Sequence, residues 1–189
     1  MRIILASGSP RRKEILASFG VDFEIISPDC DENISYKTPS ELVERLSLIK
    51  AEAVANITGT DDTFILAADT VVALGNAVLG KPSSKEDAYN MLSSLSGKCH
   101  SVYTGITALI NGVVSTTHDK TDVYFKKLTK QEILDYIETD EPYDKAGSYA
   151  LQGIGKKFVE KIDGSYSCVV GLSEEKVKEF LISAKIIEK

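Results

Sequence analysis

The residues with the clearest chemical potential near the start of the chain are the hydroxyl and guanidinium groups of Ser7-Gly8-Ser9-Pro10-Arg11-Arg12. They follow an apolar run and open a helical pattern, so we expect them at a helix N-terminus, where unpaired N–H groups and the helix dipole favour an anion. Arginine forks match phosphate oxygens, and two arginines in a first helical turn oppose the dipole unless they bind a ligand. The segment indicates a phosphate cradle, and an N-cap followed by a solvated arginine pair is an equally open alternative.

Asp69 is the charged residue of the otherwise apolar, β-rich stretch 65–72. Burying a lone carboxylate is costly unless it is paired or bound to a metal, so Asp69 is expected to be a metal ligand, a general base or half of a buried ion pair. We favour a functional role because perturbed carboxylates concentrate at active sites. Glu32, in Asp29-Cys30-Asp31-Glu32, is a candidate second carboxylate, although by itself it fits a solvated acidic turn.

Two lysines are further candidates for contact with phosphate. Lys81 lies between Gly80 and Pro82, in a segment that nearly matches a P-loop, but Pro82 replaces the hydroxyl residue that binds magnesium, so we reject the P-loop. Lys50 lies in a predicted helix and could reach a cleft; the Ser-x-x-Lys match there lacks companion motifs and is attributed to chance. The apolar stripe of this helix consists of Leu42, Leu46, Ile49 and Ala53.

A stretch with several glycines runs from Asp144 to Gly155 and contains the polar Gln152. Glycines at this density indicate backbone held close to a ligand, although composition alone favours simple turns. His100 and His118 are isolated in the sequence, which argues against a mechanism centred on histidine.

The elements that must position these residues alternate between strands and helices with short connections. Apolar and β-branched runs predict strands over 3–6, 23–26, 63–74, 77–79, 100–110, 113–125 and 157–162. Helical periodicity and N-cap residues predict helices over 10–19, 39–53, 84–95, 129–138 and 173–181. Gly75-Asn76 and Asn111-Gly112 are typical hairpin turns, so the pattern favours an α/β domain with a mixed sheet.

Composition limits the class of protein. With 189 residues, 43% of them hydrophobic, the chain suits one compact domain over 1–189 with two lobes flanking a cleft. A net charge of −6 without a basic stripe argues against stable nucleic-acid binding. Three widely spaced cysteines fit a reducing compartment, and no segment approaches the roughly 20 apolar residues that cross a bilayer. We therefore expect a cytoplasmic protein with no membrane partner.

Taken together, these motifs resemble the Maf family of nucleotide pyrophosphatases along almost the whole chain. The resemblance rests on Ser-x-Ser-Pro-Arg-Arg, Glu32, Lys50, Ala-Asp-Thr-Val, Gly-Lys-Pro, the stretch from Asp144 to Gly153, and Val-Gly-Leu at 170–172. The last motif usually continues with proline, and Ser173 stands there instead, a departure that we expect to be harmless. The resemblance implies a two-lobed α/β fold related to inosine-triphosphate pyrophosphatases, a site in the central cleft, a divalent metal (Mg²⁺ or Mn²⁺) and a possible homodimer.

The resemblance also implies roles for individual residues. Asp69 is the implied proton acceptor that activates water, and Glu32 with Asp69 would hold the metal. The positions around the phosphates, with Ser9 added from the predicted cradle, are Ser7, Ser9, Arg12, Lys50 and Lys81. The positions that set substrate preference are Arg11, Thr70 and Gln152.

These three specificity positions predict hydrolysis of dTTP and UTP to monophosphate and pyrophosphate, as a house-cleaning activity with a possible link to cell-division arrest. A glutamine amide can both accept from and donate to the pairing edge of uracil or thymine, and an arginine is unsuited to a cationic methylated guanine. Two alternatives stay open. In the first, the protein is a pyrophosphatase that acts on 7-methyl-GTP or on nucleoside triphosphates broadly. In the second, it is a non-enzymatic regulator of septum formation, the effect for which the family is named.

Overall fold

The structure, a computed structural model, describes residues 1–188 and confirms the mixed α/β architecture. Within this range the strands form a seven-stranded sheet of order β2-β1-β3-β5-β6-β7, with β4 paired to β3. The strands are β1 (Arg2–Ala6), β2 (Glu24–Ile25), β3 (Thr63–Leu74), β4 (Ala77–Leu79), β5 (Cys99–Ile110), β6 (Val113–Phe125) and β7 (Val159–Asp163). The α-helices are α1 (Pro10–Ala17), α2 (Pro39–Thr58), α3 (Lys85–Leu95), α4 (Lys130–Ile137), α5 (Tyr166–Val170) and α6 (Glu174–Ser183). Short 3₁₀ turns are η1 (Glu141–Asp144), η2 (Ala146–Ser148) and η3 (Ile154–Phe158).

The helix caps and hairpin turns that the sequence predicts are present in the structure. Thr38 and Thr129 cap α2 and α4, and Thr129 forms a full capping box with Glu132. Asn111 and Gly112 both adopt positive φ, as a two-residue type I′ hairpin requires. The β3–β4 turn at 75–76 is also present.

Two local predictions were wrong, and one short helix was not predicted. Strand β7 begins at Val159 rather than at 157, because η3 occupies the preceding residues and buries the Phe158 side chain completely. The short helix α5 was not predicted, since five residues are too few to show helical periodicity. The stripe on α2 is also rotated: Ile49 and Ala53 are only half-buried, whereas the buried face includes Val43, Ser47, Ala51 and Val54.

The described chain divides into two compact units. Unit 1 comprises Met1–Asp69, Thr104–Asp119 and the chain from Gly171 onward. Unit 2 comprises Thr70–Tyr103 and Lys120–Val170. The boundary in β3 falls between the consecutive residues Asp69 and Thr70.

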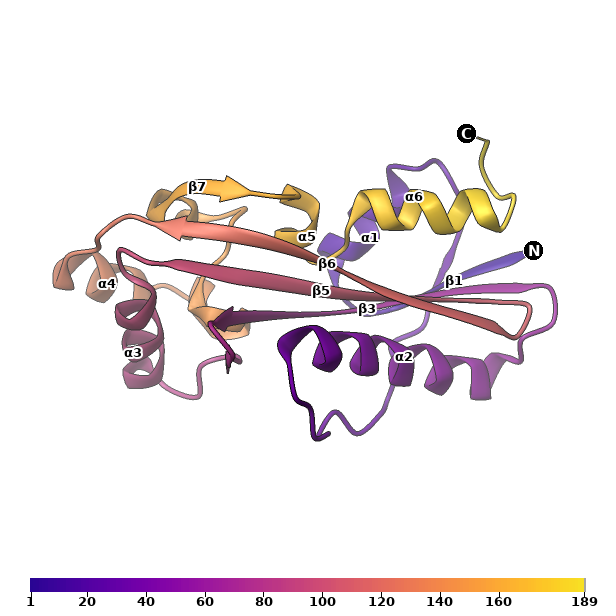
Figure 1. The fold of residues 1–189 in the computed structure, drawn as a ribbon, viewed down its shortest axis with the longest axis horizontal. Helices are drawn as coiled ribbons and strands as arrows, with labels where there is room; N and C mark the ends of the chain where they lie inside the picture. Colours follow the sequence, from indigo (N-terminus) through magenta and orange to yellow (C-terminus); the bar gives the residue numbers. More distant parts are fainter. Residues whose placement is uncertain (189) are drawn as a thin grey trace. The chain divides into compact units, whose positions relative to one another are not determined.

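In unit 1, β1 pairs in parallel with both β2 and β3, and Ile4 lies opposite Ile65. Helix α2 covers one side of these strands, and α1 with α6 covers the other (Figure 1). A Cβ at Gly105 on β5 would clash with the backbone carbonyl of Val43, so glycine at this position lets α2 pack directly against the strand. This close packing fixes α2, which carries Lys50, relative to the strands.

In unit 2, α3 and α4 pack on an aromatic core that includes Phe125, Tyr136 and Phe158. His100 is buried in this core with 2% of its surface exposed, and its Nε2 shares a 2.8 Å hydrogen bond with the Tyr149 hydroxyl. Burial lowers the pKa of His100 to about 4, and nearby Asp122 offsets this only partly. His100 is therefore a neutral, structural histidine.

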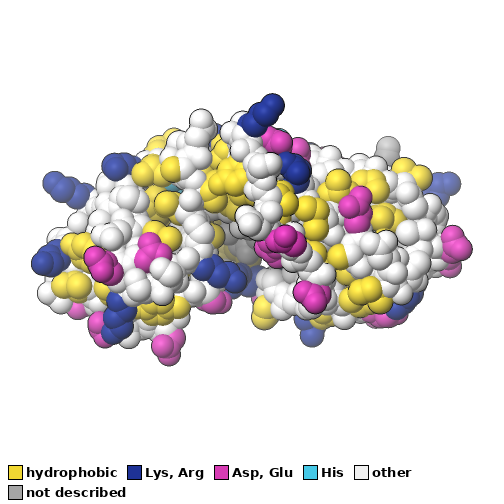
Figure 2. Space-filling view, turned by 90° about the horizontal axis from the view of Figure 1, so that it is seen from below, with side chains coloured by type: hydrophobic (Ala, Val, Ile, Leu, Met, Phe, Trp, Pro, Cys, Tyr) yellow, Lys and Arg dark blue, Asp and Glu magenta, His cyan; other side chains and the backbone are white. Residues whose placement is uncertain are grey.

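The surface carries charges of both signs. On the face drawn in Figure 2, lysine and arginine side chains are interspersed with aspartate and glutamate, and no continuous basic stripe is visible. None of the helices within residues 1–188 combines the length and the hydropathy that a membrane span requires.

Candidate functional site

The N-terminus of α1 organises the first group of predicted residues. Ser9 is the N-cap, and its hydroxyl accepts a 3.5 Å bond from the Arg12 amide. The Ser7 hydroxyl accepts bonds of 3.2 Å from the Ser9 amide and from the Arg12 guanidinium. Arg12 Nε donates to the Gly171 carbonyl over 2.8 Å. The N-cap predicted for Ser9 is thus present, and Arg12 is fixed by protein groups rather than fully solvated.

In the second group of predicted residues, one lysine contacts two carboxylates. Lys50 Nζ, on α2, lies 2.6 Å from Asp69 Oδ1 and 3.1 Å from Glu32 Oε1. Asp69 is 8% exposed near the middle of β3, and the Lys50 side chain is 12% exposed, whereas the Glu32 side chain is 55% exposed. The buried ion pair that was one alternative for Asp69 therefore exists, and it joins both predicted carboxylates to one predicted phosphate ligand.

The two groups are close enough to interact electrostatically. Burial is the largest influence on Arg12 and lowers its pKa, Asp69 and Glu32 raise it, and the like charge of Arg11 lowers it further. Arginine remains charged under all ordinary conditions, so the Asp69 carboxylate lies in a field set by Arg12 as well as Lys50. This part of unit 1 combines cations, hydroxyls and a buried carboxylate, which suits binding of a phosphate next to a proton acceptor.

The carboxylates also allow a test of the implied metal. Among residues 1–188 no group of three or more histidine, cysteine, aspartate or glutamate side chains has the geometry of a metal site. Magnesium in phosphate sites, however, is held by one or two carboxylates, and waters and substrate phosphates complete its coordination. Glu32 and Asp69 converge on one Lys50 nitrogen, so their oxygens fit such a partial site.

The remaining predicted residues are divided between the two units. Arg11 is half-buried on α1 in unit 1, whereas Thr70, Lys81 and Gln152 belong to unit 2. Thr70 is half-buried directly after Asp69, and Lys81 and Gln152 are exposed.

A backbone bond joins two of the predicted segments in unit 2. The Gly147 amide donates a 3.0 Å bond to the Gly80 carbonyl, which ties the turn bearing Lys81 to the segment bearing Gln152. Gly147 has φ +68, and a Cβ there would lie 2.9 Å from Val72 Cγ1, so the glycine signal in this segment reflects close packing as well as turn geometry.

Two residues around the predicted set carried no role in the sequence analysis. Gly171 holds Arg12 through its carbonyl and has φ +122, which only glycine adopts readily; its motif was noted, but nothing in the sequence links it to Arg12. Glu141 accepts hydrogen bonds from the backbone at Ile154 and Gly155, just after Gln152. No sequence signal distinguishes this carboxylate from an exposed one.

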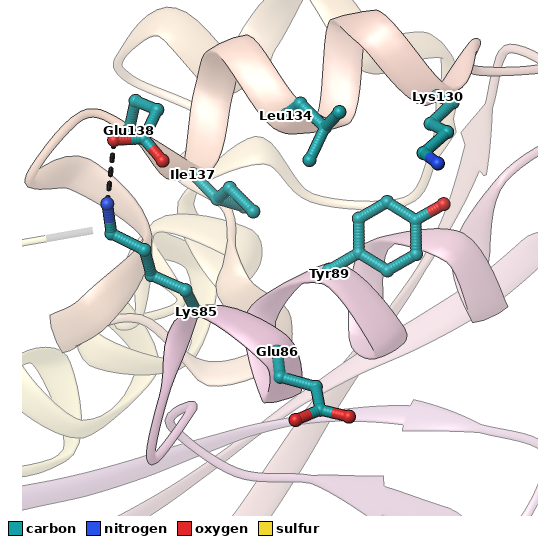
Figure 3. A pocket seen from close by; sticks show the side chains of 7 residues that line it. All are labelled: Lys85, Glu86, Tyr89, Lys130, Leu134, Ile137 and Glu138. Carbon is teal, nitrogen blue, oxygen red and sulfur yellow. Dashed lines mark hydrogen bonds and ion pairs between the residues drawn. The ribbon is translucent and has the colours of Figure 1, made fainter.

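A pocket of about 390 Å³ in unit 2 lies between α3 and α4 and is separate from these groups (Figure 3). Its apolar floor is crossed at one end by an ion pair of 2.6 Å between Lys85 and Glu138. None of the predicted site residues lines it, so the pocket gives no support to the predicted chemistry.

Comparisons with known proteins identify relatives along the whole chain. The chain is 48% identical over 188 residues to the dTTP/UTP pyrophosphatase of Thermosipho africanus, covering 100% of this chain and 96% of that protein. It is 49% identical over 172 residues to the dTTP/UTP pyrophosphatase of Bacillus anthracis, covering 90% and 89%.

The fold also has a solved relative. The Ham1 protein of Staphylococcus aureus superposes with a TM-score of 0.56 at 15% identity, covering 98% of both chains, which demonstrates a shared fold. The family model for Maf-like proteins matches residues 2–184. With this match and relatives at nearly half identity, the chain belongs to the Maf family of proteins.

Proposed function

We propose that this protein hydrolyses dTTP and UTP to the corresponding monophosphates and pyrophosphate. The observation that carries the proposal is the buried Asp69 carboxylate, which is hydrogen-bonded to Lys50 and electrostatically coupled to Arg12. Relatives that are 48% and 49% identical bear the name dTTP/UTP pyrophosphatase, which supports the same substrates here.

In this proposal the triphosphate is held by a few converging cations, because the chain as a whole carries a net charge of −6. Arg12 is already oriented by Ser7 and Gly171, so it loses little side-chain freedom when it binds phosphate. Lys50 and Lys81 add positive charge, and the hydroxyls of Ser7 and Ser9 add hydrogen-bonding groups at the N-terminus of α1.

Asp69 is the proposed proton acceptor for the attacking water. Its hydrogen bond to Lys50 fixes the orientation of the carboxylate, and a carboxylate held in place can accept a proton from a neighbouring water. Glu32 and Asp69 are the residues that would hold a divalent cation. Such a cation, when bound, supplies positive charge and Lewis acidity near the phosphates. Lys50 would then orient both carboxylates, and Arg12 would stabilise charge that develops on the departing pyrophosphate.

Arg11, Thr70 and Gln152 are the proposed readers of the base. The Gln152 amide can accept from the ring N–H of uracil or thymine and donate to a neighbouring carbonyl. In cytosine an amino group replaces one carbonyl, and it would face a donor of Arg11 or of the Gln152 amide. This mismatch costs more than the presence or absence of the thymine methyl group. The enzyme should therefore accept both dTTP and UTP and reject CTP.

Two other functions have less support. Hydrolysis of 7-methyl-GTP would require a base pocket that tolerates a cation beside Arg11. A role in septum formation without catalysis would leave the buried Lys50–Asp69 pair without a chemical purpose, so we rank this role below the enzymatic function. A cytoplasmic location, consistent with cysteines that form no disulfide within the described chain, and a homodimer remain parts of the proposal.

The products of the reaction test the proposal. Purified protein incubated with dTTP and Mg²⁺ should release dTMP and pyrophosphate in equal amounts, and treatment with a chelator should abolish the activity until Mg²⁺ or Mn²⁺ is restored. Release of inorganic phosphate with dTDP would instead identify a γ-phosphatase and refute the proposed reaction.

A further inference from the structure

The backbone on the C-terminal side of Gln152 is bound to a single carboxylate. Glu141 Oε2 accepts a 2.8 Å bond from the Ile154 amide, and Oε1 accepts a 2.8 Å bond from the Gly155 amide. The Tyr136 hydroxyl donates a third bond, also of 2.8 Å, to Oε1. One side chain on η1 thus satisfies two consecutive backbone donors, which begin two residues beyond Gln152.

The backbone on the N-terminal side of Gln152 is bound through the same assembly. The Ala150 amide donates a 3.3 Å bond to the Tyr136 hydroxyl, which in turn is held by Glu141. Tyr136 is completely buried in the core of unit 2. Gln152 therefore projects from a short loop whose two ends converge on Tyr136 and Glu141, while its own side chain is exposed.

The glycines beside Gln152 are required by this arrangement. A Cβ at Gly153 would clash with the Glu141 carboxylate, and a Cβ at Gly155 would lie 2.8 Å from the Tyr136 hydroxyl and 2.9 Å from the Ala150 carbonyl. The backbone thus wraps around the carboxylate at a distance that only glycine permits.

The electrostatics are consistent with a carboxylate that is charged in this position. Burial is the largest influence and opposes ionisation, but bonds from Gly155, Ile154 and Tyr136 outweigh it and hold the pKa of Glu141 below its ordinary value. Hydrogen bonds to a charged acceptor are stronger than neutral ones, so the loop is held more firmly than by turn chemistry alone.

We propose that Glu141 is a positioning residue for base selection: it fixes the backbone at 150–155 and so aims the Gln152 amide, without touching substrate itself. The inference rests on the proposed function of Gln152. It adds that discrimination among bases depends on a carboxylate of η1, whereas phosphate binding does not.

The test compares wild type, Glu141→Ala and Glu141→Gln in kcat/KM for dTTP and CTP. Glu141→Ala should reduce the dTTP-to-CTP preference by about tenfold, because a misplaced amide loses a net hydrogen-bond contribution of that order. Glu141→Gln keeps one oxygen acceptor but places an amino group against a backbone donor, so its loss should be smaller. Inhibition by inorganic tripolyphosphate, which has no base, should change less than twofold in both variants.

Glu132→Ala is the matched control. Its carboxylate likewise accepts a backbone N–H, at the start of α4, and its pKa is likewise lowered, chiefly by hydrogen bonds from Thr129. These bonds join it to Thr129 rather than to 150–155. It should lose stability without losing base preference. An unchanged dTTP-to-CTP ratio in both Glu141 variants would overturn the inference.

A second measurement keeps the two proposals distinguishable. Hydrogen exchange of the Ile154 and Gly155 amides should accelerate by about tenfold in Glu141→Ala, which removes both acceptor oxygens, and remain unchanged in Glu132→Ala. If exchange is unaffected, Glu141 does not hold the loop, whatever the substrate. If wild type does not hydrolyse dTTP or UTP, the proposed function fails even where exchange behaves as expected.

Discussion

At the scale of single residues, Lys50 contacts two carboxylates at once, and this sharing constrains what each can do. Asp69 is largely buried and receives the shorter bond, whereas Glu32 is more exposed and lies farther from the same nitrogen. A buried carboxylate that lost its cation would be strongly destabilised. The pair is therefore both a structural element of unit 1 and the proposed reactive centre, and these two roles can be separated by substitution.

Asp69→Asn is expected to keep the fold, because the amide oxygen can still accept the bond from Lys50. Turnover should fall by about a hundredfold or more, the scale of losing a general base. Circular dichroism and kcat for dTTP hydrolysis measure the two effects. Near-normal kcat in a folded variant would contradict the assignment of Asp69 as proton acceptor.

His100 predicts how stability depends on pH. In the folded protein its pKa is lowered to about 4 from 6.5, so the unfolded chain takes up a proton at a higher pH than the folded one. The stability contributed by neutral His100 is complete above pH 6.5 and is lost as pH falls towards 4. The full loss is on the order of 3 kcal/mol.

The measurement is urea unfolding of wild type and His100→Gln at pH 7.5 and 4.5. Glutamine can keep a hydrogen bond to Tyr149 but does not titrate, so the variant should lose less stability between the two pH values. The comparison at pH 7.5 isolates the packing cost of the substitution. Parallel pH dependence in the two proteins would show that His100 does not remain neutral when folded.

At the scale of elements, two serines at helix N-termini offer a matched comparison. The Ser84 hydroxyl accepts a 3.1 Å bond from the Asp87 amide at the start of α3. Ser173, before α6, is fully buried, and its hydroxyl has no hydrogen-bond partner among the described residues. Ser173 has φ −68, a value that suits proline, the residue usual at this point of the motif.

Ser173→Ala and Ser173→Pro should therefore raise the free energy of unfolding, by up to about 1 kcal/mol, because they remove an unsatisfied buried hydroxyl and, for proline, restrict the unfolded chain. Ser84→Ala should instead lower it by about 1 kcal/mol through loss of a cap. Chemical denaturation of the three variants tests the contrast. Loss of stability in Ser173→Ala comparable to that in Ser84→Ala would mean that the Ser173 hydroxyl is satisfied.

The elements also show what the sequence could predict. Helices such as α4 and hairpins such as β5–β6 have local signals, an N-cap residue and an Asn-Gly turn, and these elements were predicted correctly. The buried face of α2 was predicted with a rotation, because it depends on the approach of Val43 to Gly105, some 60 residues away along the chain. The 3₁₀ turns at 141–158 were missed, since Glu141 and Tyr136 stabilise them by contacts that no local pattern encodes.

At the scale of the whole molecule, the sequence predicted which residue types would do chemistry, but not how the protein itself uses them. Asp69 and Glu32 were predicted together as metal ligands and Lys50 separately as a phosphate contact, and the structure joins all three around one nitrogen. Ser9 and Arg12 were predicted as phosphate ligands, and in this structure they also bond within unit 1. The roles of Gly171 and Glu141 depend on long-range backbone contacts and could not be predicted from spacing.

The substrate class is the central claim, and charge alone does not specify it. Any nucleoside triphosphate offers the same phosphates to the proposed phosphate ligands, so under the proposal selectivity comes from groups that contact the base. The proposed base readers Arg11 and Gln152 have side chains that suit a base with two carbonyls and one ring N–H between them. Uracil and thymine have this edge, and guanine, 7-methylguanine and cytosine do not.

The most direct measurement is kcat/KM for dTTP, UTP, CTP, GTP and 7-methyl-GTP on one preparation of the full chain, with pyrophosphate release as the signal. The proposal predicts that dTTP and UTP are hydrolysed within about 200-fold of each other, since a methyl group changes binding by roughly 1–3 kcal/mol at most. CTP, GTP and 7-methyl-GTP should be poorer by a larger factor. A higher kcat/KM for GTP or 7-methyl-GTP than for dTTP would contradict the assignment of the substrate.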